Sequence, residues 1–208
     1  MTIEKNPIKE SLHKPQEMSF QSKEHKSIFP ESVFESQSNM RSGYANGALG
    51  ALVSGTVWLV SAVVAHQVSS QTAVWTLFFG GMLIHPLSLL VSKPLGIPGK
   101  HSKGNALGNL AMEGTFFMLL CIPLALLLSL QNHAWFFQGM LLIIGGRYLT
   151  FSTLYGLKIY WLLGGLLGVA AFALFTLKAD VALSALIGST IEIGFGILLF
   201  LKFRSQKA

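Results

Sequence analysis

Six apolar stretches, each about long enough to cross a lipid bilayer, occupy most of the chain after its first 47 residues. At about 1.5 Å of rise per residue, a helix of about 20 apolar residues matches a hydrocarbon core about 30 Å thick. We therefore expect an all-α fold, a polytopic integral membrane bundle of six transmembrane helices within residues 46–202. The stretches cover roughly residues 48–65, 74–92, 107–130, 134–154, 159–177 and 181–201.

The composition fits a membrane protein and argues against nucleic-acid binding. Hydrophobic residues make up 51% of the 208 residues and charged residues only 12%, whereas soluble domains carry about 25% charged residues. The net charge is +6, but the basic residues that produce it stand mostly between the apolar stretches. This distribution is typical of membrane orientation signals rather than of a nucleic-acid groove.

The basic residues also predict the orientation of the chain. If the N-terminus is cytoplasmic, eight basic residues flank the stretches on the cytoplasmic side and one, Lys178, lies on the opposite side. Cytoplasmic loops of membrane proteins carry an excess of Lys and Arg. We therefore expect both the N- and the C-terminus in the cytoplasm. The eight residues are Arg41, Lys93, Lys100, Lys103, Lys158, Lys202, Arg204 and Lys207.

Both ends of the chain differ in composition from the apolar region. Residues 1–45 are rich in Lys, Glu, Ser and Gln and show little apolar periodicity, so we expect a largely disordered cytoplasmic tail. The alternative is a short juxtamembrane helix that includes Ile28, Val33 and Phe34. Residues 203–208 are expected to form a short basic cytoplasmic tail.

The connections between the stretches are short, except for Lys93–Ala106. Short turns make sequential helices antiparallel neighbours. The two halves of the apolar region show no internal repeat, so the sequence gives no support to an inverted-repeat transporter.

Charged residues inside the apolar stretches mark a candidate polar site. Glu113 and Arg147 lie at similar depths in the third and fourth stretches, and an ion pair between them would satisfy both charges. Asn105, Asn109 and Glu113 recur every four residues, which places them on one helix face. The pair can either hold the two helices together or serve transport, and the two asparagines can equally cap or flank the helix.

Glu192 stands near the middle of the sixth stretch. Ser184, Gly188 and Gly196 share its four-residue spacing, and such small-residue faces allow helices to approach closely. Two acidic residues against one arginine leave a surplus negative charge, which a proton or cation could neutralise. The other interpretation is a Glu192 that stays protonated and donates one hydrogen bond.

His85 and Pro86 interrupt the second stretch. Pro86 cannot donate to the carbonyl of Met82, so we expect a kink in the helix. His85 can relay a proton or bind a ligand, although a core histidine bonded to a freed carbonyl is the simpler interpretation. The candidate intramembrane polar site thus comprises Glu113, Arg147, Glu192, His85 and Asn109.

The sequence lacks the motifs of common enzymes and metal sites. It has no P-loop, GxSxG or HExxH motif and no His/Cys/acidic cluster with metal-ligand spacing. We expect no catalytic residue, no metal and no cofactor, and we regard an enzyme as the less favoured class. Cys121, the single cysteine, can form no internal disulfide and is expected to be a small core residue.

Four parts of the chain carry a family resemblance. They are Arg41–Gly47 with Leu52–Trp58, Pro86–Lys93 with Leu95 and Gly96, Asn105–Gly108, and Arg147–Lys158. Together these segments resemble a family of small bacterial membrane proteins, domain of unknown function 7010, over about residues 35–200. Because that family has no assigned activity, the resemblance implies an uncharacterised multi-pass protein of the bacterial cytoplasmic (inner) membrane and no specific site residues.

Two functional hypotheses follow from these patterns. The first is a small-solute or ion permease-like protein with a polar site between the third, fourth and sixth stretches. The second is a non-transporting membrane protein that binds a partner or lipid, or that oligomerises through Gly-rich helix faces. The candidate partners are accordingly the lipid bilayer, a small solute, a proton or cation, and a second copy of the chain.

Overall fold

The computed structural model describes residues 32–206, and within them it contains only helices and the segments that connect them. The first helical segment consists of α1 (Val33–Tyr44), the short 3-10 helix η1 (Ala45–Gly47) and α2 (Ala48–Gln67). The expected all-α membrane bundle is confirmed. The other helices are α3 (Ser70–Ser92), α4 (Ala106–Ser129), α5 (His133–Tyr155), α6 (Ile159–Thr176) and α7 (Val181–Ser205).

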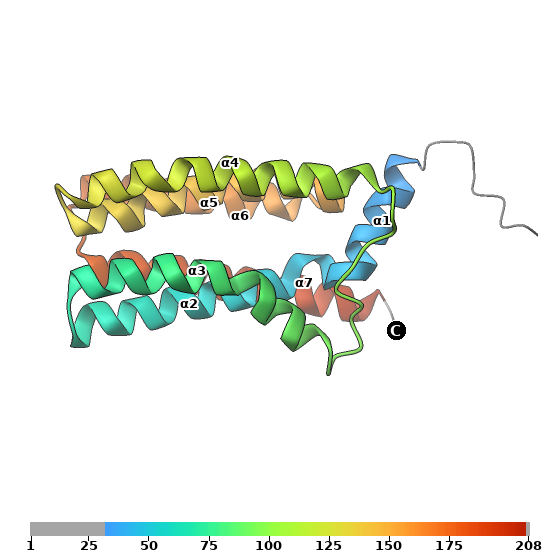
Figure 1. Ribbon diagram of the computed structural model, residues 1–208, viewed down its shortest axis with the longest axis horizontal. Coiled ribbons are helices and arrows are strands. Elements are labelled where there is room, and N and C mark those ends of the chain that lie inside the picture. The colour runs from blue at the N-terminus through green and yellow to red at the C-terminus, as the bar shows by residue number, and fades with distance from the viewer. Residues whose placement is uncertain (1–31, 207–208) are drawn as a thin grey trace, which may run out of the picture. The chain divides into compact units, whose positions relative to one another are not determined.

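The long helices form two layers of three (Figure 1). One layer contains α4, α5 and α6, and the other contains α3, α2 and α7. The most extensive packing joins α2 to α7, α5 to α6, α2 to α3 and α4 to α5, all within a layer. Helices joined by short turns are antiparallel, as the sequence predicts.

Within residues 32–206, five helical segments are long and apolar enough to cross a membrane, namely the one that contains α2 and the helices α3, α4, α6 and α7. The 23-residue helix α5 falls outside this group and carries the polar residues Gln138 and Arg147. Short turns join it to α4 at one end and to α6 at the other. Because short turns join α5 to two candidate spans, a chain in which α4 and α6 cross the bilayer requires α5 to cross it as well, which gives six candidate spans.

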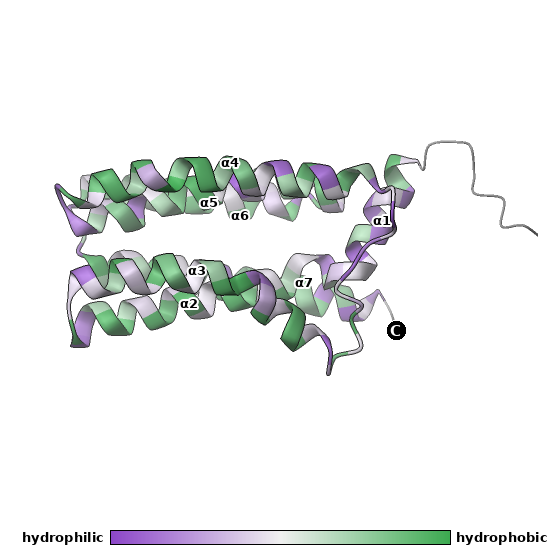
Figure 2. Ribbon diagram, in the orientation of Figure 1, coloured by the Kyte–Doolittle hydropathy of each residue, from purple (hydrophilic) through white to green (hydrophobic). Residues whose placement is uncertain are grey.

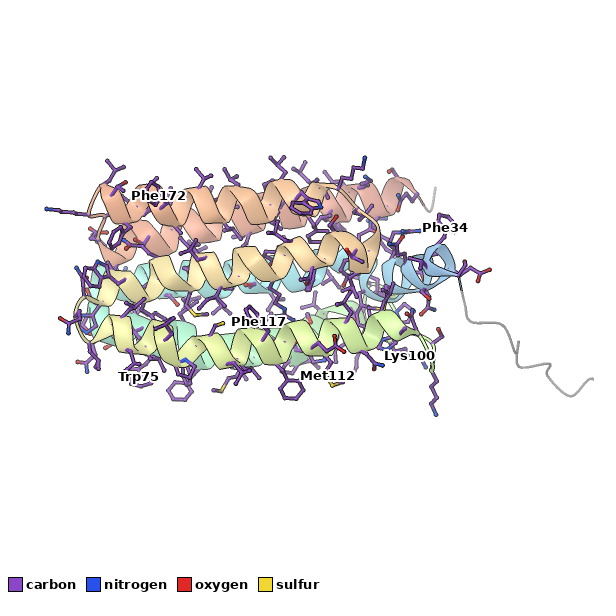
Figure 3. All side chains as sticks on the ribbon, turned by 90° about the horizontal axis from the view of Figure 1, so that it is seen from above. Phe34, Trp75, Lys100, Met112, Phe117 and Phe172 are labelled. Atoms are coloured by element: carbon purple, nitrogen blue, oxygen red, sulfur yellow. The ribbon has the colours of Figure 1, made fainter. Side chains whose placement is uncertain are left out.

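Apolar residues predominate along most of the length of the long helices (Figure 2), and many of the large ones are exposed. Phe117 of α4 and Phe172 of α6 project outward (Figure 3), with 64% and 70% of their surfaces exposed. So many large apolar side chains outside a protein core mark a surface that faces another apolar phase. The surface of the bundle is therefore suited to contact with lipid tails.

Glycines allow α7 to pack closely inside the bundle. A Cβ atom added to Gly188 would lie 2.8 Å from a ring carbon of Trp58, and one added to Gly196 would lie 2.8 Å from the side chain of Leu52. Both contacts are with α2, so the small-residue face predicted for the sixth stretch serves packing within the chain.

The amphiphilic helix α1 lies at the end of the bundle where α7 ends (Figure 1). It begins with a capping box, in which Ser32 and Glu35 each accept a hydrogen bond from the other's backbone N–H. Gln37 donates to the carbonyl of Thr153 at 2.8 Å, and Arg41 donates to the carbonyl of Tyr155 at 2.7 Å. These bonds tie α1 to the last turn of α5.

Asn39 joins α1 to the long loop before α4. Its Oδ1 accepts hydrogen bonds from the backbone N–H of Ser102 at 2.8 Å and from the hydroxyl of Ser102 at 3.1 Å. The amide of Asn105 donates to the same oxygen at 3.2 Å and to the carbonyl of Ser36 at 2.9 Å. Asn105 also caps α4, so it acts as the helix cap that the sequence offered as one alternative.

A helix therefore occupies residues 33–44 of the segment for which the sequence favoured a disordered tail and left a short helix as the alternative. Ile28 and the rest of residues 1–31 lie outside the described residues, as do residues 207–208. At the other end, α7 continues to Ser205 and so extends into the segment expected to be a tail.

Replacing Asn39 with alanine should loosen α1 from the bundle. The change leaves the donors of Ser102 and Asn105 without their acceptor, which should lower the free energy of unfolding by about 1–3 kcal/mol. Thermal unfolding of the full chain in detergent measures the effect. Ser38→Ala, at an exposed position on the same helix, is the control. Equal melting temperatures for the two variants would contradict this role of Asn39.

The orientation can be tested with single cysteines in a chain that carries Cys121→Ala. Lys103 and His133 are both exposed. Lys103 lies just before the start of α4, and His133 lies at the turn between α4 and α5, at the opposite end of the bundle. With cytoplasmic termini, a membrane-impermeant maleimide applied to intact cells should label His133→Cys and leave Lys103→Cys unlabelled until the cells are opened. The reverse pattern of labelling would overturn the orientation.

Candidate functional site

Glu192 lies where the backbones of α2 and α7 approach each other closely. Its side chain has no exposed surface. A Cβ atom added to Gly55 of α2 would lie 3.2 Å from the Cβ of Glu192 and 2.9 Å from the backbone nitrogen of Ile193. The acidic side chain is therefore enclosed by backbone on one side and cannot reach the outside of the bundle.

Few polar groups surround the carboxyl group of Glu192. The hydroxyls of Ser54 on α2 and Tyr148 on α5 face it, and the guanidinium of Arg147 is close enough to interact electrostatically. Neither carboxyl oxygen forms a hydrogen bond of standard length and angle with another described residue. Burial of a polar group without partners is costly. The carboxyl group therefore needs a proton, a cation or ordered water as compensation.

Arg147 points toward α4, where most of its contacts lie. It donates to the hydroxyl of Thr115 at 3.0 Å and to the sulfur of Met118 at 3.4 Å. Its guanidinium carbon also lies 5.3 Å from the ring centre of Phe151, a cation–π contact. The Nε of Arg147 is buried and has no hydrogen-bond partner among the described residues, so its N–H is an unused donor.

Tyrosines connect the Glu192 site to the end of the bundle where α1 lies. Tyr148 stacks on Tyr160 with 5.9 Å between ring centres, and Tyr155 stacks on Tyr160 at 5.5 Å. The hydroxyl of Tyr160 donates to the carbonyl of Asn46 at 2.6 Å. The side-chain amide of Asn46 is buried, and neither its oxygen nor its nitrogen has a partner among the described residues.

A second set of polar groups extends from Glu192 toward the opposite end. The indole N–H of Trp58 is buried without a partner among the described residues. The amide nitrogen of Gln138 makes long hydrogen bonds of 3.4 Å to the carbonyl of Ala179 and to the hydroxyl of Ser184, while its oxygen has none.

We call this series of interior groups the polar column. Its members succeed one another along the length of the bundle, from the end where α1 lies to the opposite end. They come mainly from α2, α5 and α7. The column consists of Asn46, Tyr160, Tyr148, Ser54, Glu192, Trp58, Ser184 and Gln138.

The structure brings together only part of the candidate site derived from the sequence. Arg147 is near enough to Glu192 to interact with it electrostatically, although no ion pair joins them in the described residues, whereas Glu113, Asn109 and His85 are exposed on α4 and α3. No ion pair joins Glu113 to Arg147 in the described part of the chain, because Thr115 occupies the side of α4 that faces Arg147. Glu113 is two residues away and so points about 200° around the helix.

Ser54, Tyr148, Tyr160 and Gln138 belong to the site in the structure but not to the candidate set from the sequence. Ser54 stands on a four-residue spacing with Asn46 and Gly50, which does indicate a polar face on α2. Tyrosines and a glutamine near helix ends carry no comparable signal, because such residues commonly mark the membrane boundary. Metal-ligand clusters of three His, Cys, Asp or Glu side chains are absent from residues 32–206.

Two double-mutant cycles can test whether Thr115, the partner in the structure, or Glu113, the partner expected from the sequence, interacts with Arg147. Arg147→Ala and Thr115→Ala should be coupled by about 0.5–3 kcal/mol in the free energy of unfolding, since they form one hydrogen bond. Arg147→Ala and Glu113→Ala should instead add to within about 0.5 kcal/mol. Thermal unfolding of the three single and two double variants, together with the wild type, measures both values. Coupling to Glu113 alone would restore the ion pair expected from the sequence.

Comparison with known proteins identifies a family but no relative of known activity. The chain has no significant match among curated proteins, nor among solved structures. A family model does match, over residues 33–202, which begins at the first residue of α1 and includes all six spans. The expected family is thereby confirmed: the chain belongs to the Family of unknown function (DUF7010).

Proposed function

We propose that this membrane protein is a permease-like protein for a small solute or ion, in which Glu192 binds a proton or small cation. The site lies between α2, α5 and α7. It shares Arg147 and Glu192 with the site expected from the sequence, and α2 takes the place of α4. The observation that carries the proposal is the full burial of Glu192, whose carboxyl oxygens form no hydrogen bond of standard length and angle although the hydroxyls of Ser54 and Tyr148 face them.

The surroundings of Glu192 suit a group that exchanges a proton or cation. A carboxyl group held only for packing would be expected to have its oxygens paired, as buried polar groups in proteins usually are. Here the hydroxyls of Ser54 and Tyr148 stand nearby and can each donate or accept a hydrogen bond. They can therefore adapt to a protonated or an ionised carboxyl group without a change of residues.

The polar column supplies polar groups on both sides of Glu192. Asn46 lies toward the α1 end, and Trp58 and Gln138 lie toward the other, each with an unpaired buried polar atom. Buried water commonly satisfies such groups and makes about three hydrogen bonds. A chain of such waters would connect Glu192 to both membrane surfaces, which is what permeation of a proton or small cation requires.

One observation favours the alternative, a membrane protein that binds a partner. Asn109 and Glu113 are exposed on α4, inside a span, where lipid cannot satisfy them. A helix from another protein or from a second copy could do so. The Gly faces are divided: Gly188 and Gly196 are used within the chain, whereas a Cβ atom added to Gly165 or Gly168 of α6 would meet nothing within 4 Å.

Flux measurements in liposomes distinguish the two functions. We expect the reconstituted wild-type chain to carry protons or alkali cations under an imposed pH gradient or membrane potential, as measured with a pH-sensitive dye and ion-selective dyes inside the vesicles. Glu192→Gln retains the shape of the side chain but cannot change charge, so its flux should fall to that of empty vesicles.

Glu113→Gln is the matched control, since it changes an acidic residue of another span that lies outside the polar column. Its flux should equal that of the wild type. Loss of flux in Glu113→Gln with full flux in Glu192→Gln would contradict the proposed site. If the folded wild-type chain carries no proton or cation flux, the proposed permeation of protons or cations is ruled out.

A further inference from the structure

An open cavity of about 720 Å³ lies outside the polar column, between the start of the long loop and the end of α7. Pro94, Leu95 and Ile97 form its wall on the loop side. Phe200, Phe203, Arg204 and Ser205 form its wall on α7. The cavity therefore sits at the predicted cytoplasmic boundary of the membrane.

The inner surface of the cavity is apolar. Ile97 and Phe203 belong to a small buried cluster with Ala45 and Leu49, separate from the main core of the bundle, and Phe200 packs against it. Leu95 is 47% exposed at the opening. These side chains present hydrocarbon to anything that enters, so a ligand needs an apolar part to fill the cavity.

The rim of the cavity is basic. Arg204 is an exposed lining residue, and it has no ion-pair partner among the described residues. Lys93 directly precedes Pro94, and Lys202 lies in the same last turns of α7. Segments 93–105 and 200–206 contain no acidic residue. The charge at the rim is therefore complementary to an anion.

The loop wall is held in place by backbone hydrogen bonds. The N–H groups of Leu95 and Ile97 donate to the carbonyl of Ser92 at 3.2 and 3.1 Å, and Gly99 donates to the carbonyl of Gly43 at 2.9 Å. Gly96, with φ of +64°, makes the left-handed turn between them. The cavity is thus built into the structure and does not depend on a ligand to form.

We propose that this cavity binds one anionic phospholipid of the cytoplasmic leaflet. Its phosphate would meet the guanidinium of Arg204, and the upper part of an acyl chain would lie against Leu95 and Phe200. An apolar interior below a basic rim, placed where headgroups meet hydrocarbon, matches both halves of such a lipid. A soluble anion would leave the apolar walls uncovered, and a zwitterionic lipid would bring no net charge to the rim.

Native mass spectrometry of the full chain in detergent tests the site, with dioleoyl phosphatidylglycerol as the probe and dioleoyl phosphatidylcholine as the neutral comparison. We expect wild type to retain one phosphatidylglycerol preferentially. Arg204→Ala should weaken its binding about fivefold, since a basic residue near a charged bilayer surface contributes about 1 kcal/mol. Lys158→Ala is the matched control, because it removes an exposed basic residue from the same end of the bundle but outside the cavity.

Leu95→Glu provides a second variant, because it places a negative charge at the opening while the buried cluster below stays unchanged. It should weaken phosphatidylglycerol binding at least as much as Arg204→Ala does. Equal binding by Arg204→Ala and Lys158→Ala would overturn the site. Equal retention of the two lipids by wild type would overturn its charge selectivity, and displacement of the lipid by millimolar inorganic phosphate would show that the acyl chain is not held.

Discussion

The close contact of α2 with α7 is the constraint on which the rest of the structure depends. Gly55, Gly188 and Gly196 bring the two helices close enough to enclose Glu192 completely. In lipid, helix association rests on close packing and on interhelical polar contacts, because the surrounding chains are as apolar as the helices. The same contact thus stabilises the bundle and removes an acidic side chain from both lipid and water. The buried carboxyl group of Glu192 therefore needs a proton, a cation or ordered water to offset the cost of its burial.

Helix α1 extends this organisation to one end of the bundle. The chain passes from α1 directly into α2, yet the hydrogen bonds of α1 go to α5 and to the cap of α4, in the other layer. α1 therefore links the two layers at the end where the polar column reaches Asn46. The family model begins with α1, so this linking helix belongs to the family's shared unit and not to a variable extension.

The sequence predicted the spans and their order well, because length and hydropathy alone determine which segments can cross a bilayer. It predicted less of the site. Depth along a helix follows from counting residues, and on that basis Glu113 and Arg147 were expected to pair. The direction in which each side chain points depends on how the helices rotate against each other, and α4 turns Thr115 toward Arg147 instead. Similarly, the polar composition of residues 33–44 gave little sign of the helix that their contacts with α5 and the loop stabilise.

The Glu192 site is divided between the two layers. Ser54 and Glu192 come from the layer of α2, α3 and α7, whereas Arg147 and Tyr148 come from the layer of α4, α5 and α6. The chain passes between the layers at only two connections after α2, the loop between α3 and α4 and the turn between α6 and α7, at opposite ends of the bundle. A shear of one layer against the other would therefore change the neighbours of the Glu192 carboxyl group while each layer keeps its own packing. A small sliding motion would in this way change the charge of Glu192.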